Sequence, residues 1–136
     1  MKRRVFAIML MLATSPVSIA ASSWSQQSGG VTLSHGGQTA TSPALVAPSG
    51  VAAALPVTYV AWRIELLTPP PANLKVTLCN KNWCVPLNGL KGRIKVTENF
   101  DVKGPFHFVY HVHGWGKLTP PLHVVQNALT VTYKKR

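Results

Sequence analysis

The sequence predicts an all-β domain, an antiparallel β-sandwich of seven to nine strands that is held together locally by one hairpin disulfide. Three observations support this. No segment keeps a helical period over ten or more residues, short alternating segments are separated by turn residues, and the only two cysteines flank a loop of four residues. An immunoglobulin-like sandwich fits this pattern, although the distant Cys…Trp…Cys spacing of antibody domains is absent. A small barrel is the alternative.

The disulfide hairpin fixes the register of the central part of the chain. Pairing Cys79 with Cys84 places Leu78, Thr77 and Val76 opposite Val85, Pro86 and Leu87, so the aliphatic residues share one face. Pro86 has no N–H group, which predicts an edge strand or a bulge. Two ligands of a metal site are the alternative, but no second cysteine pair or close histidine completes such a site. A disulfide that closes so short a loop contributes about 2 kcal/mol.

The N-terminus predicts export into an oxidising compartment. Residues 1–20 read as a signal peptide, with a basic start, nine apolar residues from Val5 to Ala13 and a small-x-small motif that predicts cleavage between Ala20 and Ala21. An uncleaved anchor is the alternative, but nine residues are too few, since a membrane helix needs about 20. We therefore expect one domain over residues 21–136 that does not span the membrane after cleavage. The periplasm is the expected location, and secretion is the alternative.

Charge excludes several classes of enzyme. The sequence has 14 Lys plus Arg and 3 acidic residues, and removal of Lys2, Arg3 and Arg4 leaves 11 against 3, a net charge of +8. Carboxylate-pair hydrolysis, carboxylate-rich metal sites and Ser-His-Asp triads all need more acids than Glu65, Glu98 and Asp101 supply. We expect no enzyme and no cofactor. The basic excess indicates an anionic partner or surface, or simply a cationic solvated surface.

The remaining elements follow in chain order. Residues 24–50 are rich in Ser, Gly, Gln and Thr and predict one short strand over 31–34 and then a long loop. Residues 57–67 predict a strand whose core face is Val60, Trp62, Ile64 and Leu66. Asn88-Gly89 predicts a turn, and residues 93–97 predict a strand with Ile94 and Val96 inward.

The C-terminal third predicts one strong strand and a closing hairpin. In residues 106–112, Phe106, Phe108, Tyr110 and Val112 share one face. Two further strands, over 122–125 and 129–133, are expected to flank a turn at Gln126-Asn127-Ala128.

Two clusters are candidate sites. His107, His111 and His113 lie on one face of the strongest strand, with the last two roughly 6.5–7 Å apart along it, and could bind zinc or copper. An exposed or interface strand face is the alternative, because no acid is near to orient the rings. The second cluster is a partner-binding surface made of Trp83 and Lys81 at the hairpin tip with Arg93 and Lys95. The alternative for Trp83 is that its ring folds back over the disulfide. The expected export argues against nucleic acid as a partner.

The motifs together resemble the FlhE flagellar family. They are Val60-Ala61-Trp62-Arg63, Leu74-Lys75-Val76-x-Leu78-Cys79 with Cys84-Val85, Gly116-Lys117-Leu118-x-Pro120-x-Leu122-x-Val124 and a final Val-x-Tyr, and they span residues 24–133. The resemblance implies a periplasmic, chaperone-like β-sandwich without known catalytic residues. It also implies that the protein acts at the flagellar type III export apparatus, where it limits proton leak and supports flagellar assembly and swarming.

The expected partner is accordingly a protein of the export apparatus or basal body, and a homodimer is left open. Two alternatives remain. One is an envelope-binding module that recognises peptidoglycan or lipopolysaccharide through Trp83, Trp115 and basic side chains, and the other is a metal-binding protein that uses the three histidines.

Overall fold

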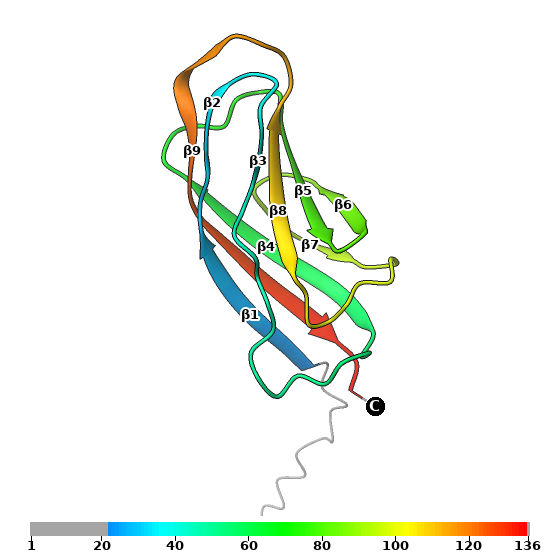
Figure 1. Ribbon diagram of the computed structural model, residues 1–136. Helices are drawn as coiled ribbons and strands as arrows, with labels where there is room; N and C mark the ends of the chain where they lie inside the picture. The colour runs from blue at the N-terminus through cyan, green and yellow to red at the C-terminus, as the bar shows by residue number, and fades with distance from the viewer. Residues whose placement is uncertain (1–21, 136) are drawn as a thin grey trace, which may run out of the picture.

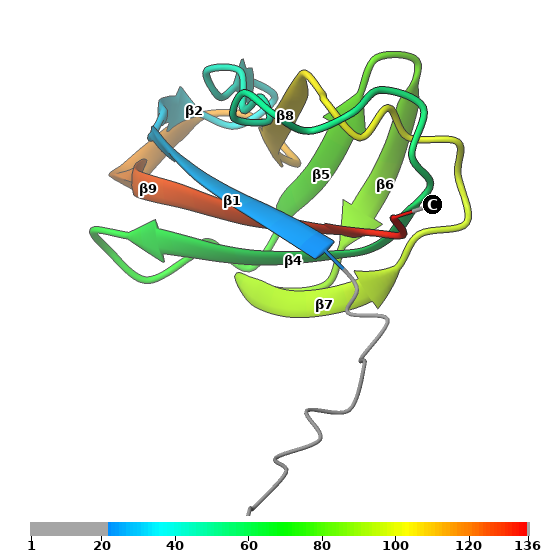
Figure 2. The ribbon, with the colours of Figure 1, turned by 90° about the horizontal axis from the view of Figure 1, so that it is seen from below.

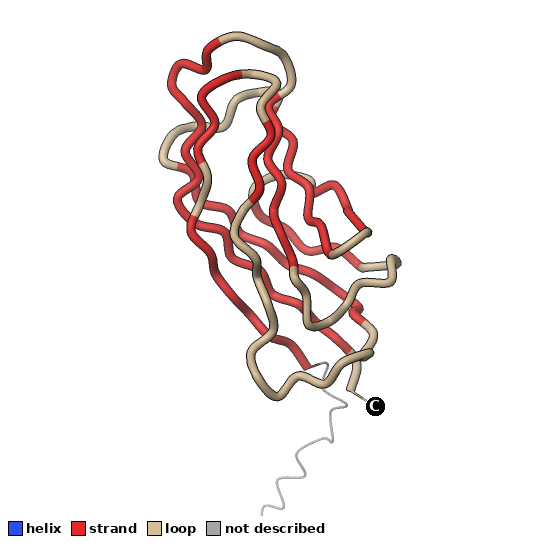
Figure 3. Tube along the Cα trace, in the orientation of Figure 1, coloured by secondary structure: helices blue, strands red, loops and turns tan. Residues whose placement is uncertain are grey.

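The structure, a computed structural model, describes residues 22–135 as two antiparallel β-sheets (Figure 1). Tracing the secondary structure shows strands and loops but no helix in this range (Figure 3). Accordingly, no described residue belongs to a helix with the length and hydropathy needed to cross a membrane. The nine strands are β1 Ser22–Gly29, β2 Thr32–His35, β3 Thr39–Thr41, β4 Val57–Leu66, β5 Leu74–Asn80, β6 Trp83–Leu87, β7 Lys91–Lys95, β8 Phe106–Val112 and β9 Lys117–Tyr133. The predicted all-β sandwich is confirmed.

The two sheets face each other across one core (Figure 2). The first has the order β1-β9-β4-β7, with β2 also paired to β9, and the second has the order β3-β8-β5-β6. Trp24 of β1 meets Phe106 of β8 edge to face, with ring centroids 5.7 Å apart. The burial of such apolar side chains between the sheets is the main stabilising term of the fold.

Alternation predicts the middle of the chain well. Val60, Trp62 and Ile64 of β4 are buried, and so are the four residues predicted to share the inner face of β8. The hairpin of β5 and β6 has the predicted register, from Val76 opposite Leu87 to Cys79 opposite Cys84. Strand β6 is an edge strand, as its proline indicates.

The predicted closing hairpin is wrong, because residues 117–133 form one continuous strand, β9. A β-bulge explains the misleading pattern. Glu65 of β4 pairs with Gln126 but Leu66 pairs with Val124, so Val125 is an extra residue. Buried positions therefore change from even to odd along β9, and Asn127, which was expected in a turn, is fully buried.

The expectation of one short strand before the long loop is wrong in part, because the polar N-terminal segment forms β1 and β3 in addition to β2, while residues 42–56 do form a loop between β3 and β4. Strand β1 pairs with β9 over its whole length, from Ser22 opposite Tyr133 to Gly29 opposite Gln126. The low β propensity of Ser and Gln is overridden by this pairing and by Trp24, whose indole N–H donates to the Val102 carbonyl at 2.9 Å.

Gly30 allows β1 and β2 to follow β9 past its bulge. A Cβ atom at Gly30 would lie 1.4 Å from the carbonyl oxygen of Val124, so no other residue fits without a backbone shift. The chain therefore breaks into two strands at this point while staying on the same partner.

The predicted signal peptide, its cleavage between Ala20 and Ala21, and the last basic residue, Arg136, lie outside the described residues.

Candidate functional site

The hairpin that carries the disulfide also carries the first predicted contact residues. The Cα atoms of Cys79 and Cys84, which lie directly opposite each other, are 4.0 Å apart, slightly closer than the roughly 4.5 Å of a non-hydrogen-bonded strand pair. The loop beyond them contains Lys81, whose φ of 54° lies in the left-handed region. Trp83 begins the returning strand and is 49% exposed. The tip therefore presents one indole to solvent on a cross-linked hairpin.

A buried asparagine joins this tip to the loop that precedes β8. Asn80 is fully buried, its amide nitrogen donates to the Asp101 carbonyl at 2.9 Å, and its amide oxygen accepts from the Asp101 N–H at 2.8 Å. The Asn80 side chain thus pairs with the N–H and carbonyl of Asp101 as the backbone of a neighbouring strand would. Because buried polar groups need such partners, this bridge fixes the position of the loop.

An ion pair closes the same junction. The Lys81 ammonium donates to the Asp101 carboxylate at 2.5 Å, and the other carboxylate oxygen accepts from the Lys103 N–H at 3.0 Å. These contacts, led by the hydrogen bond from Lys81, hold the pKa of Asp101 below its usual 3.8 against the opposing effect of partial burial. The sequence predicted that Lys81 contacts a partner protein, but in the free protein its ammonium group is already paired with the Asp101 carboxylate.

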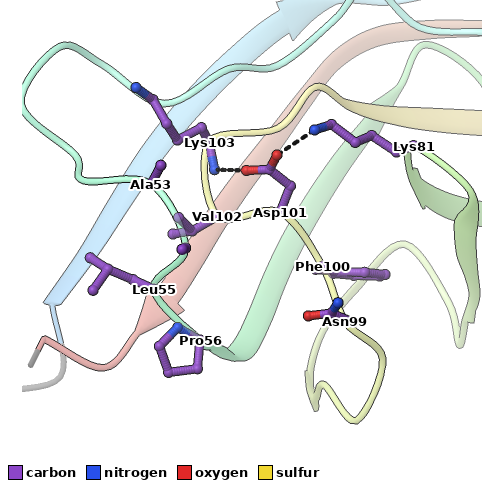
Figure 4. Close-up of a pocket in the computed structure, with 10 residues that line it drawn as sticks. Ala53, Leu55, Pro56, Lys81, Asn99, Phe100, Asp101, Val102 and Lys103 are labelled. Atoms are coloured by element: carbon purple, nitrogen blue, oxygen red, sulfur yellow. Dashed lines mark hydrogen bonds and ion pairs between the residues drawn. The ribbon is translucent and has the colours of Figure 1, made fainter.

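An open hollow of about 540 Å³ lies beside this ion pair (Figure 4). Its lining comes from three segments, Ala53–Pro56, Asn99–Lys103 and Lys81. The C-terminal end of the chain approaches it, since the Lys134 N–H donates to the Pro56 carbonyl at 3.0 Å. Both lysines of the lining lie next to Asp101, so the hollow combines opposite charges and does not form a purely cationic pocket.

The other two predicted contact residues lie on the larger sheet, opposite the sheet that carries the hairpin. Arg93 and Lys95 are exposed on β7, the edge strand of the larger sheet, and the Arg93 guanidinium stacks 4.0 Å from the centre of the Tyr59 ring. Strands β6 and β7 are both edges and run along the same side of the sandwich (Figures 1 and 2). The structure thus brings the predicted residues to one side of the molecule but not into one cluster.

The three histidines do not form a metal centre in the described residues, where no group of three His, Cys, Asp or Glu side chains could hold an ion. The ring Nδ1–H of His107 donates to the Ser42 carbonyl at 2.9 Å, and Nδ1 of His111 bonds the Thr39 hydroxyl at 2.9 Å. The rings of His111 and His113 are 6.3 Å apart, edge to face. The first two rings therefore secure the β3 segment to β8.

One feature escaped sequence reasoning, a buried polar pair in which the Tyr110 hydroxyl donates to the Asn127 side chain, and burial raises the pKa of Tyr110 well above its usual value. Trp115, which the sequence offered only as a residue of the alternative envelope-binding module, is 94% exposed. A Tyr on an otherwise apolar face is a signal for a buried polar partner, and a Gly-Trp-Gly sequence is a signal for a presented side chain.

Comparison with known proteins gives a consistent result. The family model "Flagellar protein FlhE" matches residues 30–134. Proteins named flagellar protein FlhE are similar in Escherichia coli K12, with 35% identity over 82% of this chain and 84% of the relative, and in Salmonella typhimurium LT2, with 37% identity over 92% and 97%. A solved structure, "Crystal Structure of FLHE", matches with a TM-score of 0.77 and 37% identity over 84% of this chain and 97% of the other.

Proposed function

Because the chain belongs to the FlhE family of flagellar proteins, we propose that it is a non-enzymatic accessory protein of the flagellum that acts from the periplasm on the type III export apparatus. In this proposal it limits proton leak through the export channel and thereby supports flagellar assembly and swarming. The observation that carries the proposal is the family match, which spans nearly the whole described domain in sequence and in fold. A disulfide and these relatives are consistent with a location in the cell envelope.

The signal peptide over residues 1–20 is part of the proposal. The expected mature protein begins at Ala21, and mass spectrometry of protein purified from the periplasm would test this. A mass that includes the first 20 residues would contradict the cleavage.

We place the partner contact on the side of the sandwich formed by β6 and β7. Trp83 is half-exposed there, and the edge strand β7 carries Lys91, Arg93 and Lys95, all exposed. An aromatic anchor beside several cations suits an acidic protein face, such as one on the export apparatus or basal body. Cations on an edge strand also discourage pairing with strands of other molecules, so the contact would be made through side chains.

Genetic complementation tests both the proposed flagellar function and the proposed β6–β7 contact. A deletion strain should acidify its cytoplasm faster in acidic medium and assemble and swarm poorly, and the wild-type gene should restore all three properties. Arg93→Glu with Lys95→Glu should fail to restore them. Lys134→Glu with Lys135→Glu changes the charge equally in another exposed segment and should restore them.

A deletion strain with normal proton permeability and normal flagella would refute the proposal. Equal complementation by the two double variants would refute the β6–β7 contact alone. Crosslinking in the periplasm from Trp83, replaced by a photoreactive residue, would then identify the partner directly.

Strand β1 is the edge that we propose for the homodimer. It has eight residues without charge or proline, and no described backbone hydrogen bond outside strand pairing involves it. The other long edges are protected, β7 by its cations and β6 by Pro86. Antiparallel pairing of two β1 strands should give a dimer in light scattering that Ser25→Lys weakens and Ser25→Thr preserves. A monomer at all accessible concentrations would exclude it.

A further inference from the structure

The four-residue loop between β8 and β9 presents a large apolar side chain to solvent. It lies at the end of the sandwich opposite the C-terminus, at the top of Figure 1. Gly114 and Gly116 adopt φ angles of 110° and 91°, which L side chains rarely adopt. Between them, Trp115 is 94% exposed, more than any other large apolar residue of the described chain. The loop therefore turns its only large apolar group outward.

The backbone of the loop that exposes Trp115 is fixed by hydrogen bonds on both sides. The Gly36 N–H donates to the Gly116 carbonyl and the Gly37 N–H to the Val112 carbonyl, both at 2.8 Å. On the other side, His113 exchanges hydrogen bonds with Asn73, through its N–H at 3.1 Å and through its carbonyl. The backbone that carries the indole is thus held in one place in the free protein, which reduces the backbone entropy lost on binding.

Close packing of glycines supports the same point. A Cβ atom at Gly36 would lie 2.7 Å from the Trp115 backbone nitrogen and 2.9 Å from the Gly114 carbonyl carbon. The β2–β3 turn and the β8–β9 loop therefore touch backbone to backbone. Gly36, Gly37, Gly114 and Gly116 thus lie in or against the β8–β9 loop, and none of them offers a side chain that could contact the indole.

The surroundings of the indole favour a fluid surface over a shaped one. A protein partner normally covers an aromatic anchor with a ring of further contacts, and the glycines at this end supply none. A lipid interface needs no complementary shape, and indole rings are enriched at the level of lipid headgroups.

Charge at this end points to anionic lipid. Lys117 is exposed and pairs with His35 in the register of β2 and β9, and His113 is exposed beside the tryptophan. The segments that meet here, residues 32–38, 67–75 and 111–118, contain no acidic residue. Nothing at this end would repel a phosphate-rich surface, and Lys117 would attract one.

We propose that Trp115 is a membrane anchor, which inserts its indole into the headgroup region of a bilayer containing anionic phospholipid while Lys117 contacts the phosphates. The inference does not rest on the flagellar function. If both hold, the opposite end of the sandwich and its β6–β7 side stay free for a protein partner.

Vesicle binding by the purified mature protein tests this. Vesicles of phosphatidylethanolamine with phosphatidylglycerol should bind the wild type, and added salt should weaken binding because the Lys117 contribution is screened. Vesicles of phosphatidylcholine alone should bind it poorly. Trp115→Ala should bind about tenfold more weakly, since the indole is the main apolar area offered. Trp83→Ala, which removes the other exposed indole, should bind like the wild type.

A second readout locates the indole. In Trp83→Phe the remaining tryptophans are the buried Trp24 and Trp62 and the exposed Trp115. Brominated lipids should quench part of the fluorescence of this variant and none of that of Trp83→Phe with Trp115→Phe.

The proposal is overturned if the wild type does not bind these vesicles, if Trp115→Ala binds as well as the wild type, or if quenching survives without Trp115. Swarming lost in Trp115→Ala without vesicle binding by the wild type would assign the residue to a protein contact and would also overturn it. The vesicle assay contains no flagellar component, so its failure leaves the proposed function standing.

Discussion

Replacing Asn80 tests how the hairpin and the loop before β8 are joined. The Asn80→Ala variant removes both hydrogen bonds to the backbone of Asp101, one in each direction, and leaves that N–H and carbonyl without a protein partner. A buried polar group that loses its partner costs about 1–3 kcal/mol. Asp101 is only partly buried, so water can reach it to some extent, and the lower half of that range applies to each group.

The two groups together give an expected loss of about 2–4 kcal/mol in the free energy of unfolding. This is as large as the contribution of the neighbouring disulfide, about 2 kcal/mol in the chain-entropy model. One buried amide would therefore stabilise this end of the sandwich as much as the covalent cross-link does.

Urea denaturation of the oxidised protein measures the loss, and hydrogen exchange of the Asp101 amide shows where it occurs. Asn82→Ala is the matched control, because Asn82 is exposed in the same loop, and it should change stability by less than about 0.5 kcal/mol. Exchange at Asp101 should accelerate only in the Asn80 variant. A loss below about 1 kcal/mol, or equal exchange in both variants, would show that water replaces the side chain and that the bridge does not hold the loop.

Three further predictions follow from other parts of the fold. Cys79→Ala with Cys84→Ala should lower the free energy of unfolding by about 2 kcal/mol in urea titrations, and reductant should have no further effect on that variant. The pKa of Asp101 is lowered in the folded state, so its ion pair stabilises the protein above the usual pKa of 3.8, and this contribution disappears as the pH falls below about that value. Melting curves against pH should therefore show that Asp101→Asn loses less stability in acid than the wild type does. Gly30→Ala should strongly lower the melting temperature or prevent folding because its Cβ would overlap a carbonyl oxygen, whereas Gly29→Ala has no atom within 4 Å of its Cβ and should melt close to the wild type.

The parts of the fold that follow strict alternation could be predicted from the sequence. In β4 and β8 every second residue is apolar, and the two cysteines fix the register of β5 and β6. The bulge at Val125 could not be predicted, because an extra residue in a strand and a two-strand hairpin both change the parity of the apolar pattern. Strand β1 escaped for another reason. Its strand state is imposed by pairing with β9, about 100 residues away in sequence, and not by its own composition.

The candidate contact residues show a similar limit. Sequence reasoning correctly expected exposed cations on β7, because alternation decides which face a side chain takes. It left open whether Trp83 is exposed or folded over the disulfide, and the structure shows it half-exposed. It could not show that Lys81 is held by Asp101, since the two residues meet only through the folding of a loop 20 residues away. The spacing of the histidines made a metal site a reasonable hypothesis. In the structure the ring nitrogens of His107 and His111 instead form hydrogen bonds to the β3 segment, whose position the sequence did not reveal.

The central place of β9 has a consequence for how the protein is made. This strand is the last in chain order, yet β1, β2 and β4 all pair with it, so the larger sheet cannot assemble before it has been synthesised. Contacts between such distant segments also make folding slow. The larger sheet of the nascent chain therefore stays incomplete until translation ends, which in the proposed export would keep that part of the chain unfolded enough to pass through a translocation pore.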